Sequence, residues 1–281
     1  TIKKFLRFSK LMISFILLYF SLLIIVFPKK DEILECNFYA LIFISLPLAQ
    51  VILGFISLIL IALGISQFPI LIISLTIFLI SFLKVNKSLI KIKEIKSFIQ
   101  KEIIRFYIEK SNSNSQKIFL YITFVLIILI FISSFGPINH PDASDYHVGY
   151  PYQYFLRGGF FIDGGLHQGL LGIGDYANLS FIQEKSTWFV RVIQIINLPL
   201  IVIFISRKFK NNILLITFLS IPTFIQWSTI GKPLFLGESS LIVIYLIWKE
   251  NKTLFSFKLL LISILSCIGF KLSSLIIIFP L

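Results

Sequence analysis

Long apolar runs, separated by short polar segments, dominate the chain. The runs cover residues 11–27, 38–62, 67–83, 118–135, 189–206, 213–230, 233–248 and 259–280. Each approaches the roughly 20 residues that a helix needs to cross about 30 Å of hydrocarbon. Lipid offers backbone groups no water to bond, and these runs are apolar without alternation, so the pattern predicts helices rather than barrel strands. We therefore expect an all-α polytopic membrane protein with about eight transmembrane helices.

Composition agrees with this class. Hydrophobic residues make up 57% of the chain, charged residues 14%, and the mean hydropathy is +0.94. A soluble domain typically carries about a quarter of its residues as charged side chains. The lipid bilayer is therefore the first expected partner.

One polar segment, residues 136–188, interrupts the apolar pattern at length. It contains all three histidines, four of the five aspartates and nine of the fourteen glycines. Glycine pairs and the Pro141-Asp142 step are also typical of ordinary turns, and Gly172 and Gly174 read as part of a flexible loop. The concentration of titratable groups nevertheless makes this segment the place to look for chemistry.

Charge bias gives the expected orientation. Residues 84–117 carry nine Lys or Arg against three Glu, whereas the loop 136–188 carries two cations against five acids. The positive-inside rule predicts that 84–117 is cytoplasmic and that the loop 136–188 faces outside. Three spans before residue 84 would place the basic N-terminus outside, so either one early segment does not cross or the N-terminus breaks the rule.

The net charge of +13 has a simple source in these basic segments. Cytoplasmic loops that face anionic lipid headgroups explain it better than nucleic-acid binding, which we do not expect. Within 84–117 the apolar positions from residue 90 to residue 107 recur near helical spacing with lysines between them. This pattern predicts an amphipathic helix lying on the inner leaflet.

The familiar cofactor motifs are missing from the sequence. Cys36 and Cys267 lie far apart, and no CxxC pair, Walker loop or dinucleotide-binding glycine pattern occurs. The sequence thus predicts no metal site of known spacing and identifies no cofactor. A divalent cation held against a phosphate stays open as an alternative.

Three titratable residues lie within six positions directly after the fourth apolar run: Asp142, Asp145 and His147. The two aspartates would share a face if this segment is helical. A carboxylate at the membrane surface can take a proton from an acceptor hydroxyl or help to hold a cation against a phosphate. We expect these three residues to form the catalytic group.

The run from Asp142 to Phe160, which includes Tyr146-His147 and ends in Arg157-Gly158-Gly159, resembles the first outer loop of GT-C-type glycosyltransferases. These multi-pass membrane enzymes use polyprenyl-phosphate-linked sugars as donors. In bacterial branches such a stretch follows a span and leads into an amphipathic helix. The resemblance implies a loop with short amphipathic helices, a bacterial inner (plasma) membrane location and a sugar transfer at the outer face.

The same resemblance implies roles for individual residues. Asp142 would be the base that activates the acceptor, and Asp145 and His147 would support it or bind near the donor's phosphate. Candidate substrate-binding residues are Arg157, His167, Lys232, Glu238 and Lys271. In relatives a Lys-Pro pair, here Lys232-Pro233, is usually followed directly by an acid, whereas Leu234 stands there in this chain. Lys271 lies inside an apolar run, where a lysine costs roughly 2.5–3.5 kcal/mol on insertion scales unless it finds a partner, for which Glu238 is a candidate.

The expected organisation has three parts. Residues 1–83 would form about three spans, or two spans and a re-entrant segment, and 84–117 the basic cytoplasmic segment. Residues 118–281 would form a GT-C-like core, truncated at its C-terminus. Whether the chain is an enzyme stays open at this point, because a transporter or flippase of lipid-linked sugars and a non-catalytic polytopic membrane protein are the alternatives.

Overall fold

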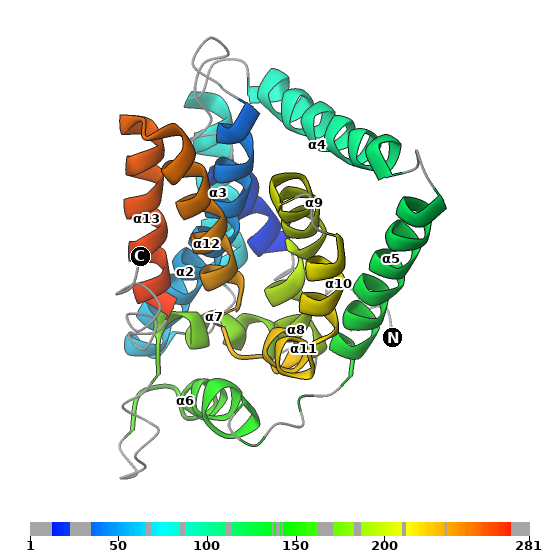
Figure 1. Ribbon diagram of the computed structural model, residues 1–281. Helices are drawn as coiled ribbons and strands as arrows, with labels where there is room; N and C mark the ends of the chain where they lie inside the picture. Colours follow the sequence, from blue (N-terminus) through cyan, green and yellow to red (C-terminus); the bar gives the residue numbers. More distant parts are fainter. Residues whose placement is uncertain are drawn as a thin grey trace, which may run out of the picture.

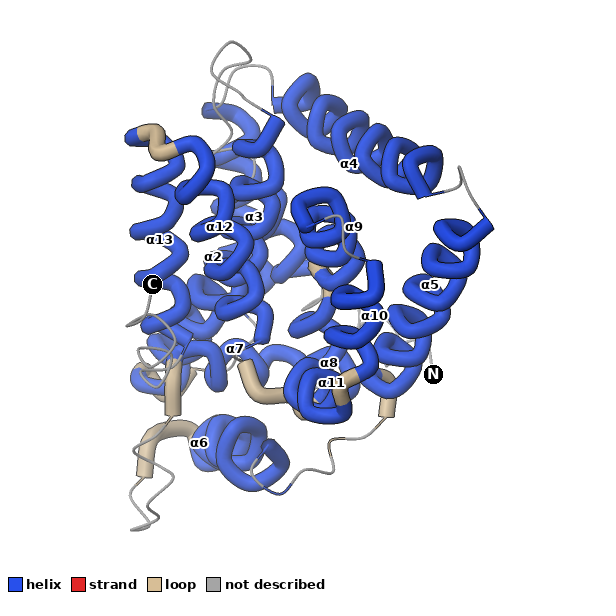
Figure 2. The backbone as a smooth tube through the Cα atoms, viewed as in Figure 1, coloured by secondary structure: helices blue, strands red, loops and turns tan. Residues whose placement is uncertain are grey.

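The computed structural model describes residues 13–22, 35–65, 69–84, 88–110, 114–136, 138, 141, 143–161, 171–182, 187–209, 212–233 and 235–270. Within these ranges every regular element is a helix, as expected (Figure 2). Asp142, His167 and Lys271 lie outside the described residues.

The helices follow the apolar runs closely. After a first helix at Ile13–Leu22 they are α2 (Glu35–Ala62), α3 (Pro69–Lys84), α4 (Ser88–Lys110), α5 (Asn114–Ser134), the π-helix η2 (Ala143–Gly149), α6 (Tyr150–Arg157), α7 (Ile173–Ile182), α8 (Thr187–Ile195), α9 (Leu198–Phe209), α10 (Asn212–Ser220), α11 (Pro222–Thr229), α12 (Phe235–Asn251) and α13 (Leu254–Phe270).

In the part of the chain that the structure describes, three helical stretches are long and apolar enough to cross a membrane, against the eight spans expected: Tyr39–Ala62, Asn114–Ser134 and Trp188–Lys208. Shorter apolar helices lie at Ile13–Leu22, Ile70–Leu83 and Leu254–Phe270. The stretch Asn114–Ser134 is only 22% buried, whereas Tyr39–Ala62 is 61% buried. In a chain of this composition, the large apolar side chains exposed on the former suit contact with lipid.

The helices form a bundle whose two ends differ (Figure 1). Helices α2, α12 and α13 pack against one another, and α5 lies at the opposite edge beside α10. The amphipathic helix α4 crosses one end of the bundle and contacts α5 and α9. The short helices α6, α7, α8 and α11 gather at the other end, where η2 leads into α6.

Helix α2 is the central element of the core. It is apolar around its whole circumference, as expected for a helix enclosed by others. Phe43, Leu53 and their neighbours are fully buried, and α2 packs against α7, α12 and α13 from the second half of the chain. The N-terminal segment is therefore in direct contact with the loop that carries the candidate chemistry.

Two details of the helix pattern differ from the expectation. The apolar run 213–230 is divided into α10 and α11, because Pro222 begins α11 after the extended residue Ile221 and removes a backbone donor there. The loop 136–188 contains α6, as expected, but also α7, whose Gly174, Ala177 and Leu179 are buried. Gly174 thus lies in a packed helix and Gly172 directly before it, rather than in a flexible loop.

Candidate functional site

A buried histidine–carboxylate pair joins the π-helix to α7. His147 Nδ1 lies 2.6 Å from Asp175 Oδ1, and both side chains have no exposed surface. The second carboxylate oxygen of Asp175 accepts a hydrogen bond from the Gly172 backbone N–H at 2.8 Å. Both oxygens of Asp175 thus have partners, which is the condition for keeping a carboxylate away from water.

Close packing holds α7 in place. A Cβ on Gly54 of α2 would overlap the backbone carbonyl oxygen of Ile173. A Cβ on Gly174 would lie 2.6 Å from Phe270 Cδ1 and 3.0 Å from Pro233 Cβ. These glycines let α2 and α13 approach α7 at backbone distance, so α7 presents Asp175 at one fixed position.

The surroundings of the pair define its chemistry. If Asp175 is ionised, the Nδ1–H of His147 donates to it, and this hydrogen bond sets the orientation of the imidazole ring. The carbonyl oxygen of His147 also lies 3.5 Å from Asn178 Nδ2. Burial, with Tyr154 and Asp175 nearby, raises the pKa of the Tyr176 phenol, which therefore stays protonated near neutral pH. The pair is thus a fixed, hydrogen-bonded unit in a buried setting.

The other members of the expected catalytic cluster are placed differently. Asp145 lies in the first turn of η2 with an exposed side chain, whereas His147 points into the core. We expected the two aspartates to share a face if this segment is helical. The described residues 143 to 149 are helical, but they form a π-helix. The structure thus gives the two described members of the cluster, one exposed and one buried, different surroundings.

The expected substrate-binding residues are spread over several elements. Arg157 ends α6 with its guanidinium 3.8 Å from the centre of the Phe161 ring. Lys232 is partly buried in the turn between α11 and α12, and Glu238 is buried in the first turn of α12. Lys232 and Glu238 therefore flank the start of one helix.

Two residues of interest were missed in the sequence. Asp175 is 28 positions from His147, and no spacing rule connects them. Arg191 in α8 is 9% exposed, and its Nε donates to the Thr229 carbonyl. A Cβ on Gly231 would lie 3.3 Å from Arg191 Cγ, so the stem of this arginine packs against the turn that carries Lys232. An arginine within an apolar run was a usable signal for Arg191.

Buried amides continue inward from this end of the bundle. Gln194 Oε1 accepts from the backbone N–H of Leu236 at 3.3 Å, and Gln194 Nε2 lies 3.4 Å from Gln50 Oε1. One step further along, Asn197 Nδ2 donates to Ser240 Oγ at 3.1 Å. These side chains form a polar seam where α2, α8 and α12 meet.

Among the described residues, no three His, Cys, Asp or Glu side chains are grouped so that they could hold a metal ion. The nearest approach to such a group is the His147–Asp175 pair, in which both carboxylate oxygens already have hydrogen-bond partners.

The fold and the site together define a helical membrane protein with a buried His–Asp pair at one end of its bundle. No protein-family model, no curated protein and no solved structure matches the chain. Function must therefore be argued from the residues themselves.

Proposed function

We propose that the chain belongs to an integral membrane glycosyltransferase that moves a sugar from a polyprenyl-phosphate donor to a lipid or cell-envelope glycan. The observation that carries the proposal is the buried His147–Asp175 pair, formed by the same loop that resembles the GT-C outer loop. A buried imidazole held by a carboxylate is an arrangement suited to acid–base chemistry.

In the proposed reaction Asp142 takes the proton of an acceptor hydroxyl. The hydroxyl oxygen forms a bond to the anomeric carbon of the donor as the bond from that carbon to the polyprenyl phosphate breaks, with inversion. His147 is a positioning residue, because its ring is fully buried and held by Asp175. The pair would fix the direction of η2 and, with it, the position of the neighbouring carboxylates.

The leaving phosphate needs positive charge close by. Arg191 and Lys232 support this part of the proposal, since Gly231 packs on the Arg191 side chain directly before Lys232. An arginine forms strong, paired hydrogen bonds to phosphate oxygens, and a partly buried lysine adds a second charge. Glu238, in the first turn of α12, would orient Lys232.

The proposed topology has about eight spans in the bacterial inner (plasma) membrane, with the loop 136–188 facing outside. Single cysteines at the exposed positions Gln153 and Lys96, in a chain with Cys36 and Cys267 replaced by Ala, test it. A membrane-impermeant thiol reagent applied to intact cells should label the cysteine at 153 and leave the one at 96 unlabelled. Equal labelling before and after cell lysis at position 96 would contradict this orientation.

The decisive experiment on the activity is a profile of glycans and lipid-linked sugars in cells that express Asp142→Asn. We expect loss of a sugar-modified product and accumulation of its polyprenyl-linked donor. Glu250→Gln is the matched control, because Glu250 is half-exposed at the other end of the bundle. An unchanged profile at equal membrane abundance would exclude Asp142 as the base.

A specific observation favours a second function, a transporter or flippase of lipid-linked sugars. The seam of buried amides at Gln50, Gln194 and Asn197 lies inside the bundle, where polar side chains in membrane proteins commonly mark a substrate path. Gln50→Leu, compared with wild type in proteoliposomes that contain a fluorescent polyprenyl-phosphate sugar, separates the two functions. Loss of flipping with retained sugar transfer would favour transport, and the reverse result would favour the transferase.

A further inference from the structure

Helix α4 has two faces, and the apolar face expected to lie on the membrane is covered by the rest of the protein. Ile95 belongs to the hydrophobic core that α2, α9 and α12 share. Phe98 packs edge-on against Tyr39 of α2, with 5.3 Å between the ring centres. Further along the same face, Glu102 and Phe106 are buried as well. This face therefore holds α4 against the end of the bundle.

The opposite face of α4 is exposed and changes character halfway along the helix. Its N-terminal half presents Lys93 and Lys96. Residues three and four positions apart lie on one side of a helix, and four such residues follow in the C-terminal half, opposite the buried face. This group, the α4 patch, has large apolar side chains that are each 50–60% exposed: Ile103, Ile104, Tyr107 and Ile108.

The α4 patch adjoins α5. Helix α4 ends at Lys110 and α5 begins at Asn114, and the two helices contact each other where they join (Figure 1). Helix α5 is long and apolar enough to cross a membrane, and its Ile118 and Tyr121 are exposed. Exposed apolar side chains on such a helix suit contact with hydrocarbon. The α4 patch thus continues the lipid-facing surface of α5 at the level where this helix starts.

Positive charge borders the α4 patch. Lys101 and Arg105 are exposed and lie one helical turn apart, and Lys117 is exposed in the first turn of α5. The nearby acids do not offset this charge at the surface, because Glu94 is partly buried and Glu102 is bound inside the bundle. A helix that combines exposed apolar side chains with bordering cations binds an anionic leaflet, since the former enter the acyl boundary and the latter attract headgroups.

We propose that the C-terminal half of α4 docks onto a leaflet of anionic phospholipid. The α4 patch inserts among the acyl chains, and Lys101 and Arg105 pair with headgroup phosphates. The N-terminal half lies over the end of the bundle and stays in water. Helix α4 therefore does not lie flat on the leaflet, as its apolar pattern predicted, and it meets lipid with the face opposite to the expected one. This inference does not depend on the proposed transferase activity.

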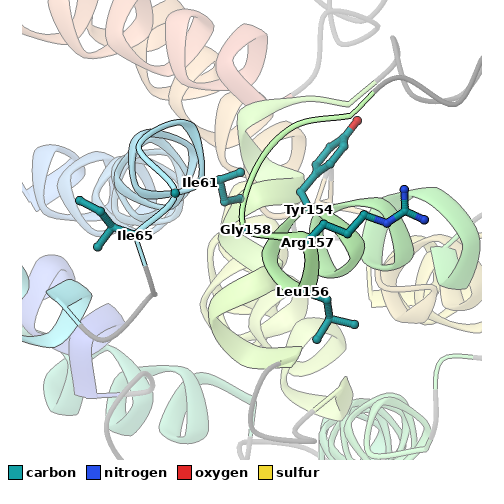
Figure 3. A pocket seen from close by; sticks show the side chains of 7 residues that line it. Ile61, Ile65, Tyr154, Leu156, Arg157 and Gly158 are labelled. Carbon is teal, nitrogen blue, oxygen red and sulfur yellow. The ribbon is translucent and has the colours of Figure 1, made fainter.

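A second exposed apolar surface, at the opposite end of the bundle, offers a comparison. A pocket of about 340 Å³ lies where α2 and α6 end, and Figure 3 shows Ile61 and Ile65 on one side and Leu156 and Arg157 on the other. Leu156 is exposed, yet Arg157 is the one cation in the lining and stacks over the Phe161 ring. Because attraction to an anionic leaflet grows with each cation, we expect no preference for anionic lipid at this pocket.

Quenching by labelled lipids tests the docking on the full chain. Cys36 and Cys267 are replaced by Ala, and a single cysteine at position 107, 96 or 121 carries an environment-sensitive fluorophore. In nanodiscs that contain doxyl-labelled phospholipid we expect strong quenching at position 107 and at position 121, the positive control on α5, and little at position 96. Equal quenching at 96 and 107 would mean that α4 lies flat, and no quenching at 107 would leave the α4 patch outside the bilayer. Either result would overturn the inference.

The headgroup preference has its own test. At equal mole fraction and low salt, doxyl phosphatidylglycerol should quench the probe at position 107 more than doxyl phosphatidylcholine does, whereas a probe at position 156 should respond equally to both. The double variant Lys101→Gln/Arg105→Gln should lower the preference about fivefold for each cation removed. The matched control Lys93→Gln/Lys96→Gln removes the same charge from the N-terminal half and should retain the preference.

Two results would contradict the assignment to anionic lipid. One is an equal quenching of position 107 by both lipids in the wild-type background. The other is an equal loss of preference in the two double variants, which would mean that the overall charge of α4 acts and not the cations beside the α4 patch.

A second copy of the chain is the rival partner for the α4 patch. It would shield the probe at position 107 from aqueous iodide but leave doxyl phospholipid without effect, and the shielding would vanish in nanodiscs that hold one chain each. That outcome would overturn the docking onto lipid. Shielding together with doxyl quenching in single-chain nanodiscs is the result that the inference predicts.

Discussion

At each end of the bundle a buried carboxylate is bound by groups from other elements, and the partners of these two carboxylates, Glu102 and Asp175, differ. At the end crossed by α4, Glu102 is bound by Arg207 of α9 and by the hydroxyl of Tyr39 in α2. At the opposite end, Asp175 of α7 is bound by His147 and a backbone N–H. Figure 1 shows α4 and α7 at these opposite ends.

The different partners predict different roles for the two carboxylates. Arg207 stays protonated at every physiological pH, so its pair with Glu102 can only fix α4 against α2 and α9. The His147 ring is a hydrogen-bonding group held in place by Asp175, so under the proposed function this pair orients the residues that carry the reaction. The Glu102 cluster is therefore an anchor, whereas the Asp175 pair is the one to which we assign a part in the proposed reaction.

The largest expected effect concerns the scaffold of the site. Gly54→Ala should destabilise the protein by about 3 kcal/mol, because the added methyl group meets the Ile173 backbone and α7 cannot move without losing its other contacts. Thermal unfolding of the detergent-purified protein measures this effect. Gly159→Ala is the control, since nothing lies within 4 Å of its Cβ position, and an equal loss in both variants would contradict the tight α2–α7 contact.

The anchor should give the next largest effect. Glu102→Gln removes the charge partner of Arg207 and should lower the free energy of unfolding by about 2–3 kcal/mol. This value lies just below the usual range of about 3–5 kcal/mol for a buried pair, because Arg207 keeps 25% of its side chain exposed. Glu250→Gln breaks the more exposed pair with Lys208 and should change stability by no more than about 0.5 kcal/mol. Denaturant titrations that rank these two variants in the reverse order would rule out the anchor.

The site pair should contribute less to stability than the anchor. Asp175→Asn keeps the shape but leaves one acceptor oxygen for two donors, His147 Nδ1–H and the Gly172 N–H. The loss of one buried hydrogen bond predicts a destabilisation of about 1–2 kcal/mol. A loss of stability larger than that of Glu102→Gln would place the main anchor at this end instead.

The sequence predicts the helical membrane class well, because uninterrupted apolar runs have few other solutions. It predicts α6 through the family resemblance but misses α7 as a packed helix. Gly172, Gly174 and Asp175 have the composition of a loop, and only the approach of α2 and α13 makes them part of the core. Pro222 could have predicted that the run 213–230 divides into two helices, because proline favours the first position of a helix.

The candidate site was predicted only in part. His147 was identified from its neighbours in the sequence, whereas its partner Asp175 depends on a contact across 28 residues. The pair Gln50–Gln194 spans 144 residues and has no local signal at all. Short-range spacing identifies candidate side chains, and tertiary packing decides which of them meet.

The most direct test of the account compares Asp175→Asn with Glu102→Gln in one assay. Both variants are expressed at matched membrane abundance, and the polyprenyl-linked sugar and its glycosylated product are measured in the same cells. We expect Asp175→Asn to lower product formation about 100-fold, the scale expected when a catalytic group is misplaced by about 1 Å, while Glu102→Gln retains wild-type turnover per folded molecule. Equal product formation by the two variants would contradict a functional role for the His147–Asp175 pair.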